Sequence, residues 1–192
     1  YIDRTLDGDT NAFSVLVTRY QDFVFTIAYR MMRSRPDAEE VAQDAFIKSF
    51  QSLSSYRGES KFSSWLYQIV YRKALDRIRS NKKMRSVELI EEITEDKNND
   101  DWGLFEEDAM HYREEKEKKK IIQDCLLKIK EQDAAIITFY YFEDLSVKEI
   151  AAITDLSPDN IKIRLHRSRK KLFSLLEQYI LPKIKDNNGK VV

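Results

Sequence analysis

The sequence predicts an all-α protein that consists of two small helical domains. Apolar residues recur at steps of three and four over residues 9–33, 38–53 and 61–80, and this spacing returns beyond about residue 110, which is the period of a helix buried on one side. No segment alternates as a strand does, and 4 glycines and 3 prolines in 192 residues are too few for a barrel or sandwich with many tight turns. We expect a helical domain in residues 1–85, an acidic flexible linker in residues 86–109, and a second helical domain in residues 110–192.

Composition limits the classes of protein to which this chain can belong. Hydrophobic residues make up 42% and charged residues 34%, so the chain has enough apolar side chains for a core beneath a strongly solvated surface. Cys125 is the only cysteine, which excludes a disulfide framework and fits a reducing compartment. No apolar run approaches the roughly 20 residues needed to span a bilayer. We expect a cytoplasmic protein without membrane insertion.

The first domain is predicted to contain three helices with defined ends. Pro36 disfavours helix at the residue before it, and Asp37 with Glu40 three residues later resembles a capping box, so a second helix is expected from residue 38. Ser60 is expected to cap the third helix, over residues 61–80. The predicted core residues of that helix are Phe62, Trp65, Leu66, Ile69 and Val70.

The second domain is predicted to contain a helix-turn-helix. A long helix from about residue 110 precedes EQDAAIITFYYFEDLS, which we expect to form two short helices broken near Gln132. Ser146 and Glu149 then form a capping box, and Ser157 before Pro158 is an N-cap followed by a favoured first helical residue. This order is typical of the motif whose second helix enters the major groove of DNA. The predicted inward stripe of that helix is Ile161, Leu165, Ser168 and Leu172.

Charge is segregated along the chain although the formal net charge is zero. Residues 55–85 carry a net charge of +7, residues 86–112 carry −9, and residues 145–192 carry +5. This asymmetry predicts two separate contacts with a polyanion and an acidic stretch between them that avoids it. The alternative is a solvated acidic linker between two ordinary basic helices.

The sequence contains no recognisable catalytic apparatus. His111 and His166 have no cysteine or second histidine at ligand spacing, so we expect no metal site. No Gly-rich phosphate loop, nucleophile–base pattern or helical HExxH is present. We expect a protein that is not an enzyme and has no catalytic residues, no cofactor and no small-molecule substrate.

Three segments, in order, resemble the bacterial RNA polymerase sigma factors of the sigma-70 family, specifically the compact extracytoplasmic-function (ECF) group. DAEEVAQDAFIKSFQSL resembles region 2.2 of that family, and YRGESKFSSWLYQIVYRKALDRIR is similar to its regions 2.3 and 2.4. LSVKEIAAITDLSPDNIKIRLHRSRKKL resembles region 4.2. The resemblance implies two all-α domains that direct core polymerase to promoters and help to melt the DNA.

The resemblance also implies a role for particular residues. The set expected to dock on the clamp helices of the polymerase β′ subunit is Asp37, Glu39, Glu40, Gln43, Asp44 and Lys48. The set expected at the −10 element, where the family captures a flipped base, is Tyr56, Arg57, Ser60, Lys61, Phe62, Trp65, Arg72, Lys73, Arg77 and Arg79. The set expected at the −35 element is Ser157, Asp159, Asn160, Lys162, Ile163, Arg164, His166, Arg167, Arg169 and Lys170. The apolar surface around residues 134–145 is expected to bind the polymerase β flap, the linker to occupy the RNA exit path, and an anti-sigma factor to be a further partner.

Four positions depart from the family pattern. Arg72 stands where the family usually has Asn, and Asp155 replaces the usual glycine of the turn. Asp tolerates left-handed backbone geometry better than most residues, so the turn is expected to persist. Asn160 and Ile163 replace the common Thr and Ser, and Ile163 predicts an apolar contact with a thymine methyl group.

The favoured hypothesis is therefore a sigma factor, and two other classes remain open at this point. A stand-alone helix-turn-helix regulator would use only the second domain and would not need the basic, aromatic segment 56–79. A protein-interaction module with adhesive basic helices would show no salt-steep DNA binding and no dependence on polymerase.

Overall fold

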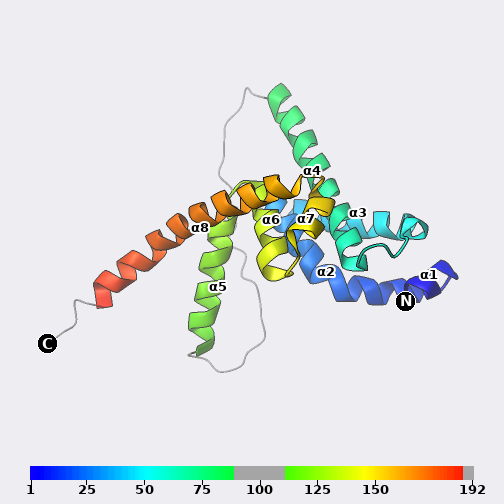
Figure 1. Ribbon diagram of the computed structural model, residues 1–192, viewed down its shortest axis with the longest axis horizontal. Coiled ribbons are helices and arrows are strands. Elements are labelled where there is room, and N and C mark those ends of the chain that lie inside the picture. Colours follow the sequence, from blue (N-terminus) through cyan, green and yellow to red (C-terminus); the bar gives the residue numbers. More distant parts are fainter. Residues whose placement is uncertain (89–110, 188–192) are drawn as a thin grey trace.

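A computed structural model describes residues 1–88 and 111–187 of the chain, with side chains described for residues 1–82 and 117–178. Over this part the protein is helical and has no strands (Figure 1). The elements are α1 (Ile2–Leu6), α2 (Thr10–Met32), α3 (Arg35–Gln51), a 3-10 turn (Leu53–Ser55), α4 (Phe62–Glu88), α5 (His111–Leu127), α6 (Glu131–Phe142), α7 (Val147–Thr154) and α8 (Pro158–Asn187). The predicted all-α class is confirmed. The predicted linker lies outside the described residues, apart from its first three positions, which continue α4.

The start of α3 differs from the prediction. Ser34, not Asp37, is the N-cap, and its side chain accepts a hydrogen bond from the backbone N–H of Asp37 at 3.5 Å. The helix begins at Arg35 and holds Pro36 in its first turn. Proline is tolerated there because the N–H that it lacks has no partner within the helix. Pro36 therefore helps to start α3 instead of delaying it.

The break predicted near Gln132 is also wrong. The chain turns earlier, between the end of α5 at Leu127 and the start of α6, and α6 then continues without interruption through Gln132 to Phe142. Every residue from Ala134 to Phe139 in α6 is buried. In a helix that is covered on several sides, apolar residues do not recur on one face only, as they do in an amphipathic helix. The spacing of apolar residues therefore did not reveal the length of α6.

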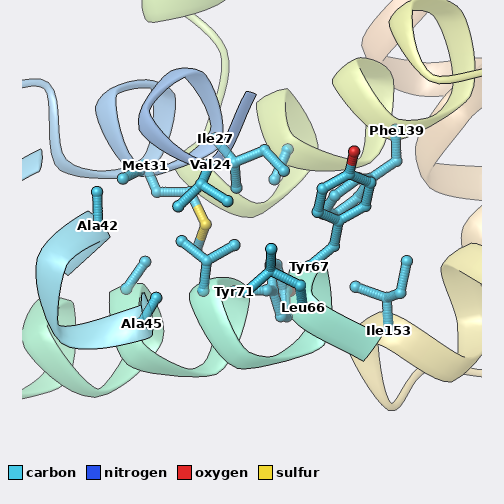
Figure 2. Close-up of a cluster of buried hydrophobic side chains, with 14 of the residues drawn as sticks. Val24, Ile27, Met31, Ala42, Ala45, Leu66, Tyr67, Tyr71, Phe139 and Ile153 are labelled. Carbon is cyan, nitrogen blue, oxygen red and sulfur yellow. The ribbon is translucent and has the colours of Figure 1, made fainter. Parts of the chain in front are cut away.

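The core of the first domain continues into the second. Val24, Ile27 and Met31 of α2 pack with α3 and α4, and Figure 2 shows this cluster extending to Phe139 of α6 and Ile153 of α7. These side chains form one hydrophobic cluster with no more than 2% exposure. In the structure the two domains are therefore docked on each other, with α6 and α7 against α2 and α4 (Figure 1).

The helix-turn-helix forms as predicted. Ser146 and Glu149 make the reciprocal capping box at the start of α7. Asp155 ends α7 with a φ of 57°. This is the left-handed conformation expected for an aspartate that stands in place of the usual glycine of the turn. Ser157 accepts a hydrogen bond from the backbone N–H of Asn160 at 3.3 Å and so caps α8. The predicted inward stripe of α8 holds: Ile161 and Ser168 are buried, and Leu165 and Leu172 are partly buried.

The capping box leads to a prediction about acid stability. Glu149 accepts hydrogen bonds from the backbone N–H and the hydroxyl of Ser146, both at 2.8 Å, and these bonds hold the pKa of its carboxyl below the ordinary value of 4.5. A carboxyl with a lowered folded-state pKa stabilises the fold above the unfolded-state pKa, and this contribution disappears as pH falls through the folded-state value. We expect Glu149→Gln to weaken the pH dependence of the melting temperature below about pH 4.5. Glu177→Gln on the exposed surface of α8 is the control, and equal slopes for Glu149→Gln and the wild type would contradict the prediction.

Candidate nucleic-acid interface

The first turns of α8 present the residues predicted to contact the −35 element. The side chain of Ile163 is 51% exposed, and Arg167 and Asn160 are also exposed. Arg164 is more enclosed: its guanidinium lies 2.7 Å from the carboxylate of Asp133 on α6 and donates a second hydrogen bond to the Asn160 amide oxygen at 3.0 Å. The remaining predicted residues are also exposed; they are the capping residue Ser157 and, within the helix, Asp159, Lys162, His166, Arg169 and Lys170.

A groove separates this part of α8 from α4. It measures about 630 Å³, and its walls include Leu75 and Ile78 of α4 opposite Ile163, Arg164 and Arg167 of α8. That is the size of a pocket for a small molecule, far too small for a DNA duplex. In this arrangement four residues of the predicted −35 set line the groove opposite the first domain: Asn160, Ile163, Arg164 and Arg167.

The loop before α4 and its first turn form an aromatic cluster. The rings of Tyr56, Phe62 and Trp65 contact one another with centroids 5.4–5.7 Å apart. The Tyr56 hydroxyl donates a hydrogen bond to the Ser60 carbonyl at 2.6 Å, which closes the loop around Gly58 with its φ of +72°. Phe62 is only 8% exposed and belongs to the core, whereas Tyr56 and Trp65 are half-buried and retain an exposed part.

Ion pairs join the residues predicted to bind DNA to those predicted to bind polymerase. Arg77 of α4 bonds to Glu40 and lies 3.4 Å from Asp37, both on α3. Lys73 of α4 lies 3.7 Å from Asp44 of α3. These two predicted cations are therefore paired with carboxylates of α3. Phosphate would have to displace these carboxylates to reach them.

The rest of the predicted polymerase-binding set is exposed on α3. Glu39, Gln43 and Lys48 lie at exposed positions of this helix. Glu39 and Gln43 border a shallow groove of about 340 Å³ between α2 and α3, whose apolar walls are Val17, Phe25, Ala42 and Phe46. Sequence reasoning missed this groove; Ala42 is buried, and Val17, Phe25 and Phe46 are partly buried.

Polar contacts join α4 to the helix-turn-helix along one edge of the domain interface. Arg72 binds the Asp155 carboxylate through two guanidinium nitrogens, with the shortest distance 2.9 Å. Gln68 donates to the carbonyl of Ala152 at 2.7 Å. The Tyr67 hydroxyl donates to the Glu143 carboxylate at 2.7 Å, and burial together with this bond raises the pKa of Tyr67 above its ordinary range. Two positions at which the chain departs from the family pattern, Arg72 and Asp155, are thus partners.

Contacts from α2 to α6 form the other edge. Arg30 is 6% exposed, donates to the Thr138 hydroxyl and lies over the Phe142 ring at 4.5 Å. Arg33 donates to the carbonyl of Ile129 at 2.6 Å and lies 3.5 Å from Glu131. Burial lowers the pKa of Arg30 to about 10.

Between these edges the interface is aromatic. Phe139 of α6 is fully buried against the rings of Phe23, Tyr67 and Tyr71, with centroids 5.9–6.5 Å apart. Burial raises the pKa of Tyr71 to about 12. All three partners of Phe139 belong to the first domain.

Comparison with known proteins identifies the family. Residues 16–84 match the model of sigma-70 region 2, and residues 119–172 match the model of sigma-70 region 4. The chain is 33% identical over 184 residues to the ECF RNA polymerase sigma-E factor of Haemophilus influenzae, covering 94% of each chain. It is 30% identical over 181 residues to the ECF RNA polymerase sigma factor SigW of Bacillus subtilis, covering 89% of this chain and 92% of that relative. The chain belongs to the ECF sigma factors.

Solved structures share the fold of this sigma factor. The sigma factor RpoE of Bartonella quintana, solved with the anti-sigma factor NepR, has a TM-score of 0.68 at 16% identity and covers 88% of this chain and 98% of its own. CnrH, solved with the cytosolic domain of CnrY, has a TM-score of 0.60 at 21% identity, with 92% and 95% covered.

As an ECF sigma factor, the chain directs core RNA polymerase to promoters for transcription initiation. The stand-alone regulator is not favoured, because the family match includes the first domain as well as the helix-turn-helix. In the part of the chain that the structure describes, no three or more potential ligands gather into a metal-binding group, and no helix is long and apolar enough to cross a bilayer.

Exposure of Ile163 gives a prediction about base reading. An apolar side chain at this position of α8 fits the methyl group of thymine, the major-groove feature that uracil lacks. We expect replacement of one −35 thymine by uracil to weaken wild-type binding by about 1 kcal/mol, which is close to the free energy of burying one methylene group. In the Ile163→Ala variant this replacement should no longer weaken binding. The test is a double-mutant cycle that measures the affinity of the wild type and of Ile163→Ala for the thymine DNA and for the uracil DNA. Equal uracil effects in wild type and Ile163→Ala at every −35 thymine would contradict the contact; Lys171→Ala on the same helix is the control.

Proposed function

We propose a division of labour between the two domains of this sigma factor. Residues 1–85 bind core polymerase and the −10 element, and residues 110–192 bind the −35 element and the β flap. The observation that carries this assignment is the presence of two separate cationic surfaces, one on α4 and one on α8, each within a matched sigma region. The protein acts in the cytoplasm as a specificity subunit and is not itself an enzyme.

The loop before α4 is proposed to hold unpaired bases of the −10 element. Tyr56 and Trp65 offer partly exposed rings next to the exposed cations Arg57 and Lys61. Flat aromatic surfaces beside cations favour single-stranded bases, which can stack, over a closed duplex. Phe62 supports the two rings from the core. Ser60, Arg72, Lys73, Arg77 and Arg79 complete the set, and Lys73 and Arg77 take part after release from α3.

The first turns of α8 are proposed to read the −35 element in the major groove. Asn160, Ile163 and Arg164 lie in the first two turns of the helix, where a recognition helix meets base edges. Exposed cations further along, including Arg167, Arg169 and Lys170, bind phosphates and fix the register of the helix on the duplex.

Core polymerase is proposed to contact both domains. The acids and amide exposed on α3, Glu39 and Gln43 among them, dock on the β′ clamp helices, and the adjoining groove between α2 and α3 supplies apolar contact. The β flap binds the apolar surface of residues 134–145. The linker, residues 86–109, passes along the RNA exit path, where its net negative charge keeps contact with nucleic acid displaceable.

An anti-sigma factor is proposed as a further partner. A structure similar to this chain is that of the sigma factor RpoE of Bartonella quintana, solved with the anti-sigma factor NepR. Another similar structure, CnrH, was solved with the cytosolic domain of CnrY. A partner of this kind would act by binding the surfaces on α3 and α6 that polymerase uses.

Reconstituted transcription tests the proposal. The purified chain is mixed with bacterial core RNA polymerase and a library of genomic promoter fragments, and transcripts are mapped. Initiation that requires the chain and occurs at a common −10 and −35 sequence is the expected result. DNA binding without polymerase association or initiation would overturn it in favour of a stand-alone regulator. Absence of both activities would overturn the division of labour as well.

A further inference from the structure

We infer that a small cavity beside Arg30 binds a monatomic anion of the chloride type. The cavity lies between α2 and α5, and the residues that line it are Thr26, Tyr29, Arg30, Gln123 and Leu127. None of these five residues belongs to the sets proposed for DNA or polymerase, so the inference does not depend on those assignments.

The charge of Arg30 is not balanced by the described part of the chain. The side chain is 6% exposed, and its contacts are a hydrogen bond to the Thr138 hydroxyl and the face of the Phe142 ring. Burial alone lowers the pKa of Arg30, with no contribution from an acid. Arg164, which is also partly enclosed, has the carboxylate of Asp133 at 2.7 Å. Burial of an unpaired charge is unfavourable unless an opposite charge accompanies it.

Nitrogens of Arg30 that make no hydrogen bond reach space that a small group can occupy. Among the described residues, the fully enclosed side-chain atoms without a hydrogen bond are Ser64 Oγ and Arg77 Nε. The nitrogens of Arg30 are not among them, although the structure gives Arg30 a single hydrogen bond, to Thr138. The adjoining cavity measures about 30 Å³, which is room for one or two water-sized groups.

The lining of the cavity suits an anion of this size. No carboxylate lines it, and the side-chain amide of Gln123 adds N–H donors to those of Arg30. The Thr26 hydroxyl donates to the carbonyl of Asp22 at 2.7 Å, so we assign the anion to Arg30 and Gln123. Leu127 supplies an apolar wall, and the exposure of Gln123 leaves a path to solvent. A water molecule would fit the same volume, but only an anion balances the charge of Arg30.

An anion in this cavity links the stability of the protein to the identity of the salt. A ligand that binds the folded chain and not the unfolded chain raises the free energy of unfolding as its concentration rises. Screening, by contrast, depends on ionic strength and not on the size of the anion. A comparison of a small and a large anion at one ionic strength therefore isolates the site.

Thermal unfolding at constant ionic strength is the first test. Sodium gluconate, whose anion is too large for the cavity, is replaced stepwise by sodium chloride at about 0.2 M total salt. We expect the melting temperature of the wild type to rise by about 2–4 °C and to level off as the site fills. A melting temperature that stays constant or falls would overturn the inference.

Two arginine variants show whether the rise belongs to this site. Arg30→Met removes the charge and keeps an unbranched apolar side chain, a change that a buried unpaired charge tolerates. Arg19→Met makes the same change at an exposed position of α2. We expect the chloride-dependent rise to disappear in Arg30→Met and to persist in Arg19→Met. Equal rises in the two variants would overturn the inference.

Chloride NMR tests binding without unfolding the protein. Binding is measured as the broadening of the chloride resonance that bromide reverses and gluconate does not. Gln123→Ala removes an amide donor at an exposed position, so we expect it to weaken chloride binding about tenfold without loss of helical circular dichroism. Gln51→Ala, exposed at the end of α3, is the matched control and should keep wild-type affinity. Equal affinities of the two glutamine variants, or no chloride binding by the wild type, would overturn the site.

Discussion

A Leu66→Ala variant is expected to lower the free energy of unfolding by about 2–5 kcal/mol. Leu66 is fully buried at the centre of the first domain, on the helix that carries the proposed −10 residues (Figure 2). Truncation removes its apolar packing against α2 and leaves a cavity that the surrounding helices fill only in part. Urea unfolding followed by circular dichroism measures the change.

The control for this variant is Ile47→Ala on α3. Ile47 is 56% exposed, so its truncation should change the free energy of unfolding by no more than about 0.5 kcal/mol. Similar losses for the two variants would contradict the position of Leu66 in the core.

An Arg164→Ala variant is expected to lose about 1–3 kcal/mol of discrimination between the −35 element and unrelated DNA, while binding of core polymerase is unchanged. Arg164 is the cation nearest the start of α8 that has a planar group suited to paired contact with a guanine edge. Its bond to Asp133 at 2.7 Å must open for this contact to form. Competition binding of the polymerase holoenzyme to matched and scrambled −35 sequences measures the loss.

Two further variants separate base reading from other effects. Asp133→Asn weakens the same ion pair but keeps the guanidinium, so discrimination should be retained or improved. Arg169→Ala removes an exposed cation further along α8, so it should weaken binding to all sequences alike and reduce the salt slope by about 0.9. Equal loss of −35 recognition and polymerase binding in Arg164→Ala would refute the assignment of that residue.

Local features of the fold could be predicted because they depend on neighbouring residues. The capping box of Ser146 and Glu149, the N-cap at Ser157 and the left-handed Asp155 each follow from side chains within three or four positions of a helix end. The stripe of α8 follows from its period. The same logic failed at Pro36, because proline can stand either before a helix or in its first turn.

Contacts between domains could not be predicted because they depend on a surface that is remote in the sequence. Tyr67 and Tyr71 were not predicted to be in the core, yet both are 2% exposed because α6 covers them. Phe139 was predicted to lie on a surface for the β flap and is instead buried against them. No local period indicates which distant helix will cover a given face.

The candidate site was predicted as a list of residues but not as an arrangement. Most members of the −10 and −35 sets lie on exposed positions, as their polarity indicated. The bonds of Arg77 to Asp37 and Glu40 depend on how α3 crosses α4. Phe62 lies in the core, with the ring of Tyr56 from the loop and the ring of Trp65 from α4 against it.

The burial of Arg30 has a consequence for how readily the domains part. A guanidinium removed from water without a carboxylate partner among the described residues makes the docked form less stable than an apolar side chain of similar size would. Separation returns Arg30 to water, and this hydration offsets part of the free energy needed to expose the apolar surface around Phe139. The docked arrangement is therefore less stable than its apolar contacts alone would make it.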